Sequence, residues 1–395
     1  MRERALFLIL LGINFLVLLL EIKGLSISYN EAKIIYSDHL SFLGSLITSS
    51  LHIFGQNDYA LRLPMIGLHL LSVVLLYSIS KHYVSRSSDR LWIVLIYVLL
   101  PGVTSAALVV DNAGLIITLL FLFVYLYIRF ERYALILLPF MILVDPSFVY
   151  LFFGLILFGI YRKDYVSSFI GFIALVISLY VYGIHIGGLP ESRFLDVLGV
   201  YTAIFSPIVF IYLFYVLYRR MIAREWDVIW MISMSAFIVS LLLSFRQKVE
   251  VQSFAPYLLI ALPLAAQTFF HTYRVRLREF RKRYRFLFYS AFTLLIANAL
   301  AVFFNHYLYH FLSNPMRHFS YPMHIAKELS HQLHKNNIHC VDAENDKLQL
   351  RLRFYGITQC ENYRLSEKAA RGSKKVTISY TGKPIYFIYV TKIHK

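Results

Sequence analysis

Long apolar runs dominate the sequence, and short polar segments separate them. Nine runs approach the roughly 17 to 25 residues needed to cross the hydrocarbon core of a bilayer, near positions 5–22, 63–80, 91–109, 112–128, 166–186, 197–218, 226–244, 254–271 and 286–309. A further stretch, from Tyr133 to Tyr161, is interrupted by Asp145 and Pro146. Because proline kinks helices and an aspartate at mid-depth is costly in lipid, this stretch predicts two short helices that meet at Asp145. The pattern predicts a polytopic α-helical membrane protein of about eleven transmembrane helices.

The first apolar run begins like a signal peptide, with Arg2 and Arg4 before it. No small-residue cleavage pattern of the A-x-A type follows, and the next polar residues are Glu21 and Lys23. We therefore expect an uncleaved first helix rather than a removed leader.

The pattern changes after Ser313. The segment His324–Lys335 has apolar residues at helical spacing, and the runs Ile338–Ala343, Lys375–Tyr380 and Pro384–Val390 have the composition of short strands. The sequence thus predicts a transmembrane domain over residues 1–312, with a first outer loop at 24–61, and a small soluble α/β domain over 313–395.

Both cysteines of the chain, Cys340 and Cys360, lie in the predicted soluble domain. A disulfide between them is expected if this domain faces an oxidising compartment such as a periplasm. Two reduced, buried cysteines are the alternative, and the spacing leaves both possibilities open.

The composition agrees with a membrane protein. Hydrophobic residues make up 58% of the chain and charged residues 15%, against about 25% charged residues in ordinary soluble proteins, and the mean hydropathy is +0.62.

The net charge of +17 raises the possibility of nucleic-acid binding. The cations, however, occupy alternate loops: Arg2, Arg4, Lys81, Arg86, Arg90, Arg129, Arg132, Arg162, Lys163, Arg219, Arg220, Arg224 and a run between Arg274 and Arg285. Short loops rich in Lys and Arg stay in the cytoplasm, so the N-terminus is predicted inside and the residues after Tyr309 outside. The positive charge therefore reflects the membrane topology, and no nucleic-acid partner is expected. The basic run 274–285 is expected to face anionic lipid headgroups.

This topology places a mixed set of ionisable residues on the outer side: Glu31, Asp38, His39, Asp58, Arg62, Asp111, Glu191, Arg193, Asp196, Arg246, Lys248 and Glu250. Carboxylates with a few cations are what acid–base work on an anionic substrate needs. Nucleotide-binding loops of the G-x-x-x-x-G-K-[ST] type, H-E-x-x-H motifs and paired C-x-x-C motifs are absent. We expect no protein metal site and no obligatory cofactor, while a divalent metal ion remains possible.

Three features of the outer side have two readings each. Asp111, in LVVDNAGL, is either a site residue or an N-cap that accepts the N–H groups of Ala113 and Gly114. Asp145 either has a structural role at the helix kink or approaches an outer cavity. Arg246 and Lys248 are either interfacial anchors or a phosphate clamp.

Histidines between positions 306 and 334 are expected at the surface or the membrane interface rather than as metal ligands: His306, His310, His318, His324, His331 and His334.

Several short motifs resemble, in their order and sidedness, those of the polyprenyl-phosphate-dependent glycosyltransferases of the GT-C superfamily. Within it, the motifs look like those of the lipid A aminoarabinose transferases and of bacterial relatives of the protein O-mannosyltransferases. The motifs are NEA (30–32), SDHLSF (37–42), LHIFGQNDYALRLP (51–64), VVDNAGL (109–115), RQKVEVQSFAP (246–256) and LQLRLRFYG (348–356). The resemblance spans nearly the whole chain.

The resemblance implies an inverting, membrane-embedded glycosyltransferase in the cell inner membrane, with a cytoplasmic N-terminus and a periplasmic C-terminal domain. It would move a sugar from a polyprenyl-phosphate donor to lipid A, another glycan or a protein, in contact with membrane lipids. We expect Glu31 to act as the base, with Asp38 and Asp111 as assisting carboxylates. The donor phosphate would be bound by His39, Arg193, Arg246 and Lys248.

The sequence departs from the family pattern at three places. Asn30 replaces the family's catalytic aspartate, Leu40 and Ser41 replace two prolines, and Val144 replaces a lysine. An amide cannot act as a base, so the role would pass to Glu31 or Asp38. The alternatives are a catalytically silent relative that binds a lipid-linked sugar, and a transporter of lipid intermediates.

Overall fold

The computed structural model describes residues 2–37, 41–183, 193–310, 314, 318, 320–369, 373–380 and 383–393. The chain divides into two compact units, each discontinuous in sequence. The first unit comprises Met1–Phe15, Met65–Ala107 and Asp111–Ala299, and the second comprises Leu16–Pro64, Leu108–Val110 and Leu300–Lys395.

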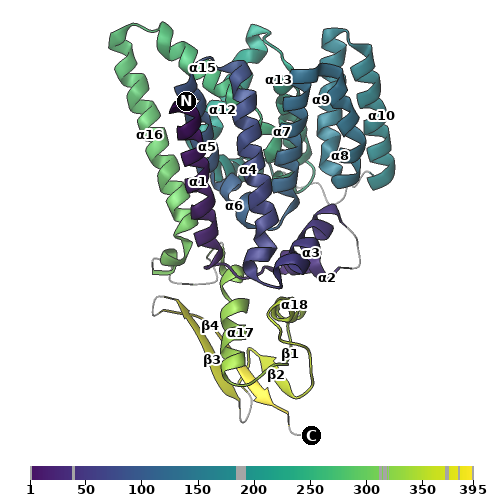
Figure 1. Cartoon of the computed structure of the whole chain (residues 1–395), viewed down its shortest axis with the longest axis vertical. Coiled ribbons are helices and arrows are strands. Elements are labelled where there is room, and N and C mark those ends of the chain that lie inside the picture. The colour runs from purple at the N-terminus through teal and green to yellow at the C-terminus, as the bar shows by residue number, and fades with distance from the viewer. Residues whose placement is uncertain are drawn as a thin grey trace. The chain divides into compact units, whose positions relative to one another are not determined.

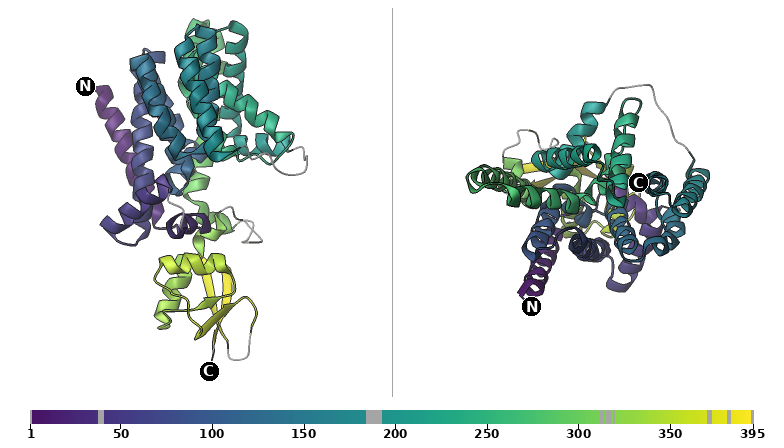
Figure 2. Two further views of the ribbon diagram at one scale, coloured as in Figure 1. Left: turned by 90° about the vertical axis from the view of Figure 1, so that its right-hand side faces the viewer. Right: turned by 90° about the horizontal axis from the view of Figure 1, so that it is seen from above.

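The first unit is a bundle of helices that run side by side (Figure 1; Figure 2 shows two further views). Its helices, some shared with the second unit, are α1 (Arg2–Ile22), α4 (Asp58–Tyr83), α5 (Ser87–Leu99), α6 (Pro101–Leu108), α7 (Asn112–Phe130), η1 (Glu131–Leu137), α8 (Leu138–Val144), η2 (Pro146–Phe148), α9 (Val149–Arg162), α10 (Tyr165–Tyr182), α11 (Phe194–Phe205), α12 (Pro207–Ala223), α13 (Val228–Ser244), α14 (Val251–Leu259), α15 (Leu262–Val275) and α16 (Arg278–Phe303).

The described helices include five that are long and apolar enough to cross a membrane, or up to eight if each of three bent helix pairs is one span. The three pairs are α5 with α6, α11 with α12, and α14 with α15. The prediction of a polytopic helical membrane protein is confirmed, while the count of eleven crossings stays a prediction.

The run 197–218, which the sequence predicts as one helix, is two helices bent by 108°. The bend falls at Ser206, whose φ of 67° lies in the left-handed region, and Pro207 opens α12. A left-handed residue ends the first helix, and the fixed φ of proline starts the next.

The predicted break at Asp145 is confirmed. Asp145 ends α8 and caps the short helix η2, with its Oδ1 accepting the N–H of Ser147 at 2.8 Å. Pro146 stands at the first helical position, where its missing N–H costs nothing. Beyond the break α9 packs against α10 and α13. At Gly154 a Cβ would lie 2.8 Å from the backbone of Ile232, so glycine permits the close approach of α9 and α13.

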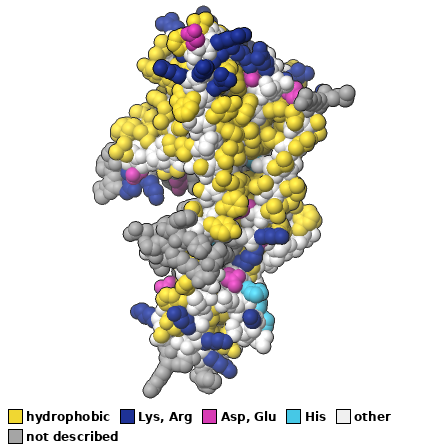
Figure 3. Space-filling model, turned by 90° about the vertical axis from the view of Figure 1, so that its left-hand side faces the viewer, with side chains coloured by type: hydrophobic (Ala, Val, Ile, Leu, Met, Phe, Trp, Pro, Cys, Tyr) yellow, Lys and Arg dark blue, Asp and Glu magenta, His cyan; other side chains and the backbone are white. Residues whose placement is uncertain are grey.

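One end of the first unit collects charged residues from loops that the sequence placed together on the cytoplasmic side. Arg90 pairs with Glu3 at 3.3 Å, and Arg274 pairs with Asp89. Figure 3 shows Lys and Arg side chains gathered at this end, the upper end in that view, above a broad hydrophobic surface. The grouping of these loops at one end is confirmed, whereas the side of the membrane that they face stays a prediction.

The second unit carries a four-stranded sheet in the order β1-β2-β4-β3. Strand β1 pairs with β2 in parallel, and β4 pairs antiparallel with β2 and β3. Its elements are α2 (Tyr29–Tyr36), α3 (Phe42–Phe54), η3 (Asn305–His310), η5 (Tyr321–His324), α17 (Ala326–Lys335), β1 (Asp342–Ala343), α18 (Asp346–Phe354), β2 (Tyr363–Ser366), β3 (Lys374–Tyr380) and β4 (Lys383–Lys392).

The core of the second unit lies between the sheet and helices α17 and α18 (Figure 1). The predicted helix at 324–335 and the strands near 375–380 and 384–390 are present, while β2 and α18 were not predicted. Cys340 and Cys360 form a disulfide with a Cα separation of 5.4 Å, which decides between the two possibilities that the sequence left open.

Candidate functional site

The first outer loop contains a short helix, α2, that begins with a capping box. Ser28 Oγ accepts the N–H of Glu31 at 3.2 Å, and Glu31 Oε2 accepts the N–H of Ser28 at 2.7 Å. The S-x-x-E spacing produces this reciprocal pair, which satisfies two donors that a helix start leaves unpaired. The predicted base thus has a structural role at the start of α2.

Glu31 is completely enclosed, with an exposed fraction of 0%. Its Oε1 accepts the backbone N–H of Val110 at 2.9 Å, and its Oε2 lies 3.6 Å from Nη2 of Arg62, which is also 0% exposed. Arg62 Nη2 in turn donates to the carbonyl of Ser26 at 3.0 Å. Buried charges are tolerated when they are paired and hydrogen-bonded in this way.

Asp58 continues this network toward the C-terminal segment. Its carboxylate accepts the hydroxyl of Tyr355 at 2.7 Å, lies 2.8 Å from Nζ of Lys327, and lies 3.6 Å from Nη1 of Arg62. Tyr355 Oη also accepts the N–H of Ile27 at 2.9 Å. Burial, with a contribution from Asp58, raises the pKa of the Tyr355 phenol well above its usual value.

We call Glu31, Asp58, Arg62, Lys327 and Tyr355 the outer-loop network. Sequence reasoning did not single out Lys327, included Tyr355 only as part of the LQLRLRFYG motif, and gave Asp58 and Arg62 no role beyond lying outside. The spacing of Asp58 and Arg62, four residues apart, was a signal for a helical ion pair.

Three other positions of the first outer loop matter for the family resemblance. Asn30, which stands where the family has aspartate, is exposed on α2 beside the buried Glu31. Asp38 and His39, predicted as an assisting carboxylate and a phosphate ligand, lie outside the described residues.

Asp111 and Asp145 both belong to the first unit, and Asn112 connects them. Asp111 Oδ1 accepts the N–H of Asn112 at 2.7 Å, and the Nδ2 group of Asn112 donates to Asp145 Oδ2 at 2.7 Å. Asp111 therefore does stand at the N-cap of α7, although its partner is Asn112 rather than the two residues expected. Asp111 is half-buried and Asp145 is buried, so Asp111 is the more accessible carboxylate.

Two of the predicted phosphate-binding residues lie on neighbouring segments of the first unit. The N–H of Arg193 donates to the carbonyl of Ser244 at 2.9 Å, and the rings of Phe194 and Phe245 stack with centroids 5.2 Å apart. These contacts bring Arg193 next to the segment that contains Arg246. Arg246 is exposed, and so is Lys248, two residues farther on.

The histidines differ from expectation at two positions. His318 and His324 are buried, not at the surface, and both contact Tyr309: His318 stacks on its ring at 4.2 Å, and His324 Nδ1 hydrogen-bonds its hydroxyl at 2.8 Å. The side chains of His306 and His310 lie outside the described set. Within the described part of the chain, no group of three His, Cys, Asp or Glu residues could hold a metal ion.

An apolar cavity of about 520 Å³ lies in the first unit between α5, α12, α15 and α16. Its lining is almost entirely aliphatic and aromatic, with Trp92, Tyr212, Phe269 and Phe288 among its larger side chains. Such a cavity can hold a hydrocarbon chain but offers few groups to a polar ligand.

No protein-family model and no curated protein sequence matches the chain. Its fold, however, is similar to the crystal structure of ArnT from Cupriavidus metallidurans in the apo state, with a TM-score of 0.57 and 10% sequence identity. The similarity covers 98% of this chain and 97% of that one. The chain therefore has an ArnT-like fold, with several described helices long and apolar enough to cross a membrane.

Proposed function

We propose that this protein is a GT-C glycosyltransferase that transfers a sugar from a polyprenyl-phosphate donor to a lipid, glycan or protein acceptor. The observation that carries the proposal is the similarity of fold to ArnT over nearly the full length of both chains. The motif resemblance and the ionisable residues of the outer loops support it. The proposed location is the inner membrane, with the N-terminus in the cytoplasm and the C-terminal unit in the periplasm.

The reaction needs one base and several cations. A carboxylate takes the proton of the acceptor hydroxyl. The oxygen of that hydroxyl then forms a bond to the anomeric carbon of the sugar, and the configuration at this carbon inverts. The bond between that carbon and the phosphate oxygen breaks at the same time, and polyprenyl phosphate leaves. A positioned base contributes about 10²- to 10⁴-fold to the rate, and cations that meet the developing phosphate charge lower the barrier further.

The structure guides the choice of base between Glu31 and Asp111. Both oxygens of Glu31 accept backbone N–H groups, and its side chain is fully enclosed. Asp111 retains accessible surface, and Asn112 joins it to a second carboxylate, Asp145. We therefore propose Asp111 as the base and Glu31 as a positioning residue that holds the first outer loop. The sequence-based assignment of Glu31 as the base stays the competing prediction.

Three cations of the first unit, the half-buried Arg193 and the exposed Arg246 and Lys248, are proposed to bind the donor phosphate. Arg193 and Arg246 lie on adjoining segments, and Lys248 follows at an exposed position. Arginine offers bidentate contacts to phosphate and lysine a point charge. The apolar cavity between α5, α12, α15 and α16 is suited to the hydrocarbon part of a lipid substrate.

The test of this proposal is transfer from a radiolabelled polyprenyl-phosphate sugar by the purified protein in liposomes, with Asp111→Asn compared to Glu31→Gln. We expect Asp111→Asn to abolish turnover without a change in thermal stability, because the side chain is half-buried and the amide keeps its shape. Asp196→Asn, an exposed carboxylate of α11, is the control and should retain turnover. If Glu31→Gln stays folded and inactive while Asp111→Asn is active, Glu31 is the base.

A catalytically silent relative that binds a lipid-linked sugar is the second candidate. It is favoured by one observation, the exposed Asn30 at the position of the family's aspartate. Tight binding of the labelled donor with no turnover would identify it.

A further inference from the structure

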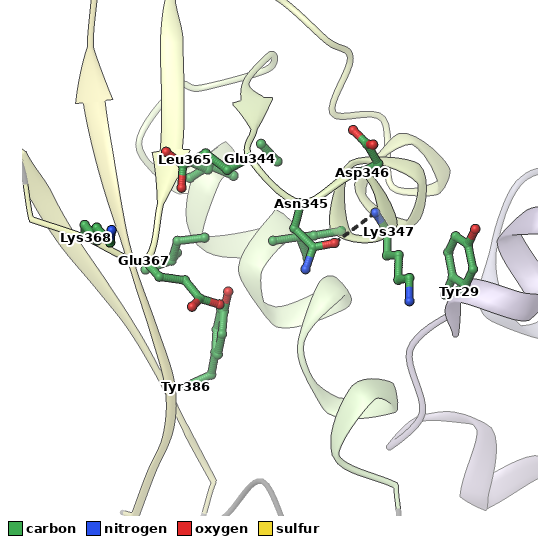
Figure 4. A pocket seen from close by; sticks show the side chains of 12 residues that line it. Tyr29, Glu344, Asn345, Asp346, Lys347, Leu365, Glu367, Lys368 and Tyr386 are labelled. Carbon is green, nitrogen blue, oxygen red and sulfur yellow. Dashed lines mark hydrogen bonds between the residues drawn. The ribbon is translucent and has the colours of Figure 1, made fainter.

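A polar hollow of about 580 Å³ lies entirely within the second unit, where the start of α18 faces the end of β2 and the middle of β4 (Figure 4). Tyr29 of α2 closes one side, and Tyr386 of β4 stands on the other. None of its lining residues belongs to the outer-loop network or to the Asp111 group, so the proposed reaction leaves it without a role.

The floor of the hollow is apolar and its rim is polar. Leu348, Leu365 and Ile388 belong to the buried core of the unit and form the floor. Above them, the Asn345 amide and the Tyr386 and Glu367 side chains point toward the same space (Figure 4). A small number of convergent polar groups over an apolar base is the usual composition of a small-molecule site.

Local structure fixes the polar groups on one side. Asn345 caps α18 by accepting the N–H of Lys347 with its Oδ1 at 3.0 Å, so that its amide nitrogen is presented to the hollow. The Lys347 ammonium lies over the ring of Tyr29, 5.4 Å from its centroid. Two donors are thus held in place before any ligand arrives.

Acceptors are presented on the opposite side. Glu367 forms no ion pair with any described residue, and it faces the hydroxyl of Tyr386 across the hollow's edge. Burial and the nearby Glu367 raise the pKa of Tyr386 to about 12, so its hydroxyl keeps its proton and can donate. Glu344, by contrast, is already bound to Arg364 at 3.2 Å and to the Ser366 hydroxyl at 3.0 Å.

The charge balance limits the class of ligand. The lining holds three carboxylates and two ammonium groups, a mixture that does not favour a phosphate or another anion. Metal binding needs converging ligands, and the described residues contain no group of three that could hold an ion. A neutral molecule with many hydroxyl groups and an apolar face can hydrogen-bond the donors and acceptors of the hollow and also pack against its apolar floor.

We propose that this hollow binds a carbohydrate, with the Asn345 amide, Glu367 and the Tyr386 hydroxyl bound to sugar hydroxyls and the apolar floor under the sugar ring. In the context of the proposed function, and resting on it, the carbohydrate is part of the acceptor. A transferase that recognises its acceptor away from the reacting hydroxyl uses that binding energy to hold the acceptor in position.

Binding is tested on the full chain in detergent micelles by saturation-transfer NMR with maltose, chitobiose and L-arabinose as probes. Tyr386→Phe and Glu367→Gln each remove one polar contact, and we expect them to weaken binding by about five- to tenfold, the range for a lost hydrogen bond. Tyr389→Phe is the matched control on the opposite face of β4 and should bind like wild type. Binding of none of the three sugars, or equal binding by all variants, overturns the proposal.

A kinetic measurement separates this proposal from the proposed function. With a saccharide acceptor, Tyr386→Phe should raise KM for the acceptor and leave kcat and the donor KM unchanged. Sugar binding that depends on Tyr386 in a protein without turnover would sustain the hollow as a carbohydrate site and contradict the transferase. Turnover with an unchanged acceptor KM in Tyr386→Phe would contradict the acceptor role alone.

Discussion

Oε1 of Glu31 accepts the backbone N–H of Val110 at 2.9 Å, although 79 residues separate them. Val110 immediately precedes Asp111, which is more accessible than Glu31, the other candidate base among the described residues. Glu31 thus fixes the backbone next to a candidate catalytic residue, while its other oxygen caps α2 and faces Arg62. A carboxylate with these hydrogen bonds holds the first outer loop in position. Replacing Glu31 should therefore first lower the thermal stability of the protein.

Replacing Glu31 by glutamine should destabilise the protein. The amide keeps the size of the side chain but removes one of the two carboxylates that pair with the buried Arg62, leaving Asp58 alone beside it. Breaking a buried pair typically costs about 3–5 kcal/mol. The midpoint of thermal unfolding in detergent should fall by several degrees, whereas Lys33→Gln, at an exposed site on the same helix, should leave it unchanged. An equal midpoint in Glu31→Gln and wild type would be incompatible with a positioning role.

Asn30→Asp restores the carboxylate that the family has at this position. Because Asn30 is exposed, the substitution should not alter the unfolding midpoint. If Asp111 is the base, the transfer rate should stay within about threefold of wild type, since surface substitutions usually have small effects. A gain of about 100-fold or more, the usual contribution of a base, would instead show that the wild-type chain lacks its main catalytic carboxylate.

Arg246→Ala should raise the KM for the polyprenyl-phosphate donor by about tenfold, the loss expected for one charge-assisted hydrogen bond. Its effect on stability should be small because the side chain is exposed. Arg283→Ala, at an exposed site in the basic run, serves as a control and should not change donor KM. The same donor KM in both variants would assign Arg246 to interfacial anchoring.

Stability should decrease at mildly acidic pH through His318. Burial lowers its pKa below the usual 6.5, with its Nε2 hydrogen-bonded to the carbonyl of Asn305. A histidine with a lowered folded-state pKa contributes stability above its unfolded pKa, and this contribution is lost as the pH falls from about 6.5 toward the folded-state value. The loss in midpoint between pH 7.5 and pH 5.5 should be smaller in His318→Gln. An identical pH dependence in both proteins would exclude this role for His318.

Features encoded locally could be predicted from the sequence. The apolar runs predicted most helices of the first unit. Asp145 and Pro146 predicted the break between α8 and α9. Both are local because a lipid span and a proline kink depend on neighbouring residues alone. The loops that group at the basic end were also predictable, since the distribution of Lys and Arg follows the topology.

Features that depend on distant contacts could not be predicted. Tyr355 and Asp58 are 297 residues apart, and no local pattern links them. Helix α18 has the sequence DKLQLRLRF, whose alternating leucines are typical of a strand. It is helical because Asn345 caps its start and because it packs against α2 and α17. The candidate carboxylates were found from sidedness, but their burial, which separates their roles, required the structure.

The most direct test of the transferase proposal follows the labelled sugar itself. Wild-type protein in liposomes, given a radiolabelled polyprenyl-phosphate sugar and a panel of lipid A, oligosaccharide and peptide acceptors, should release polyprenyl phosphate and label one acceptor class, with Asp111→Asn inactive. Saturable binding of the donor with neither release nor acceptor labelling, in wild type and in Asn30→Asp alike, would contradict the proposal.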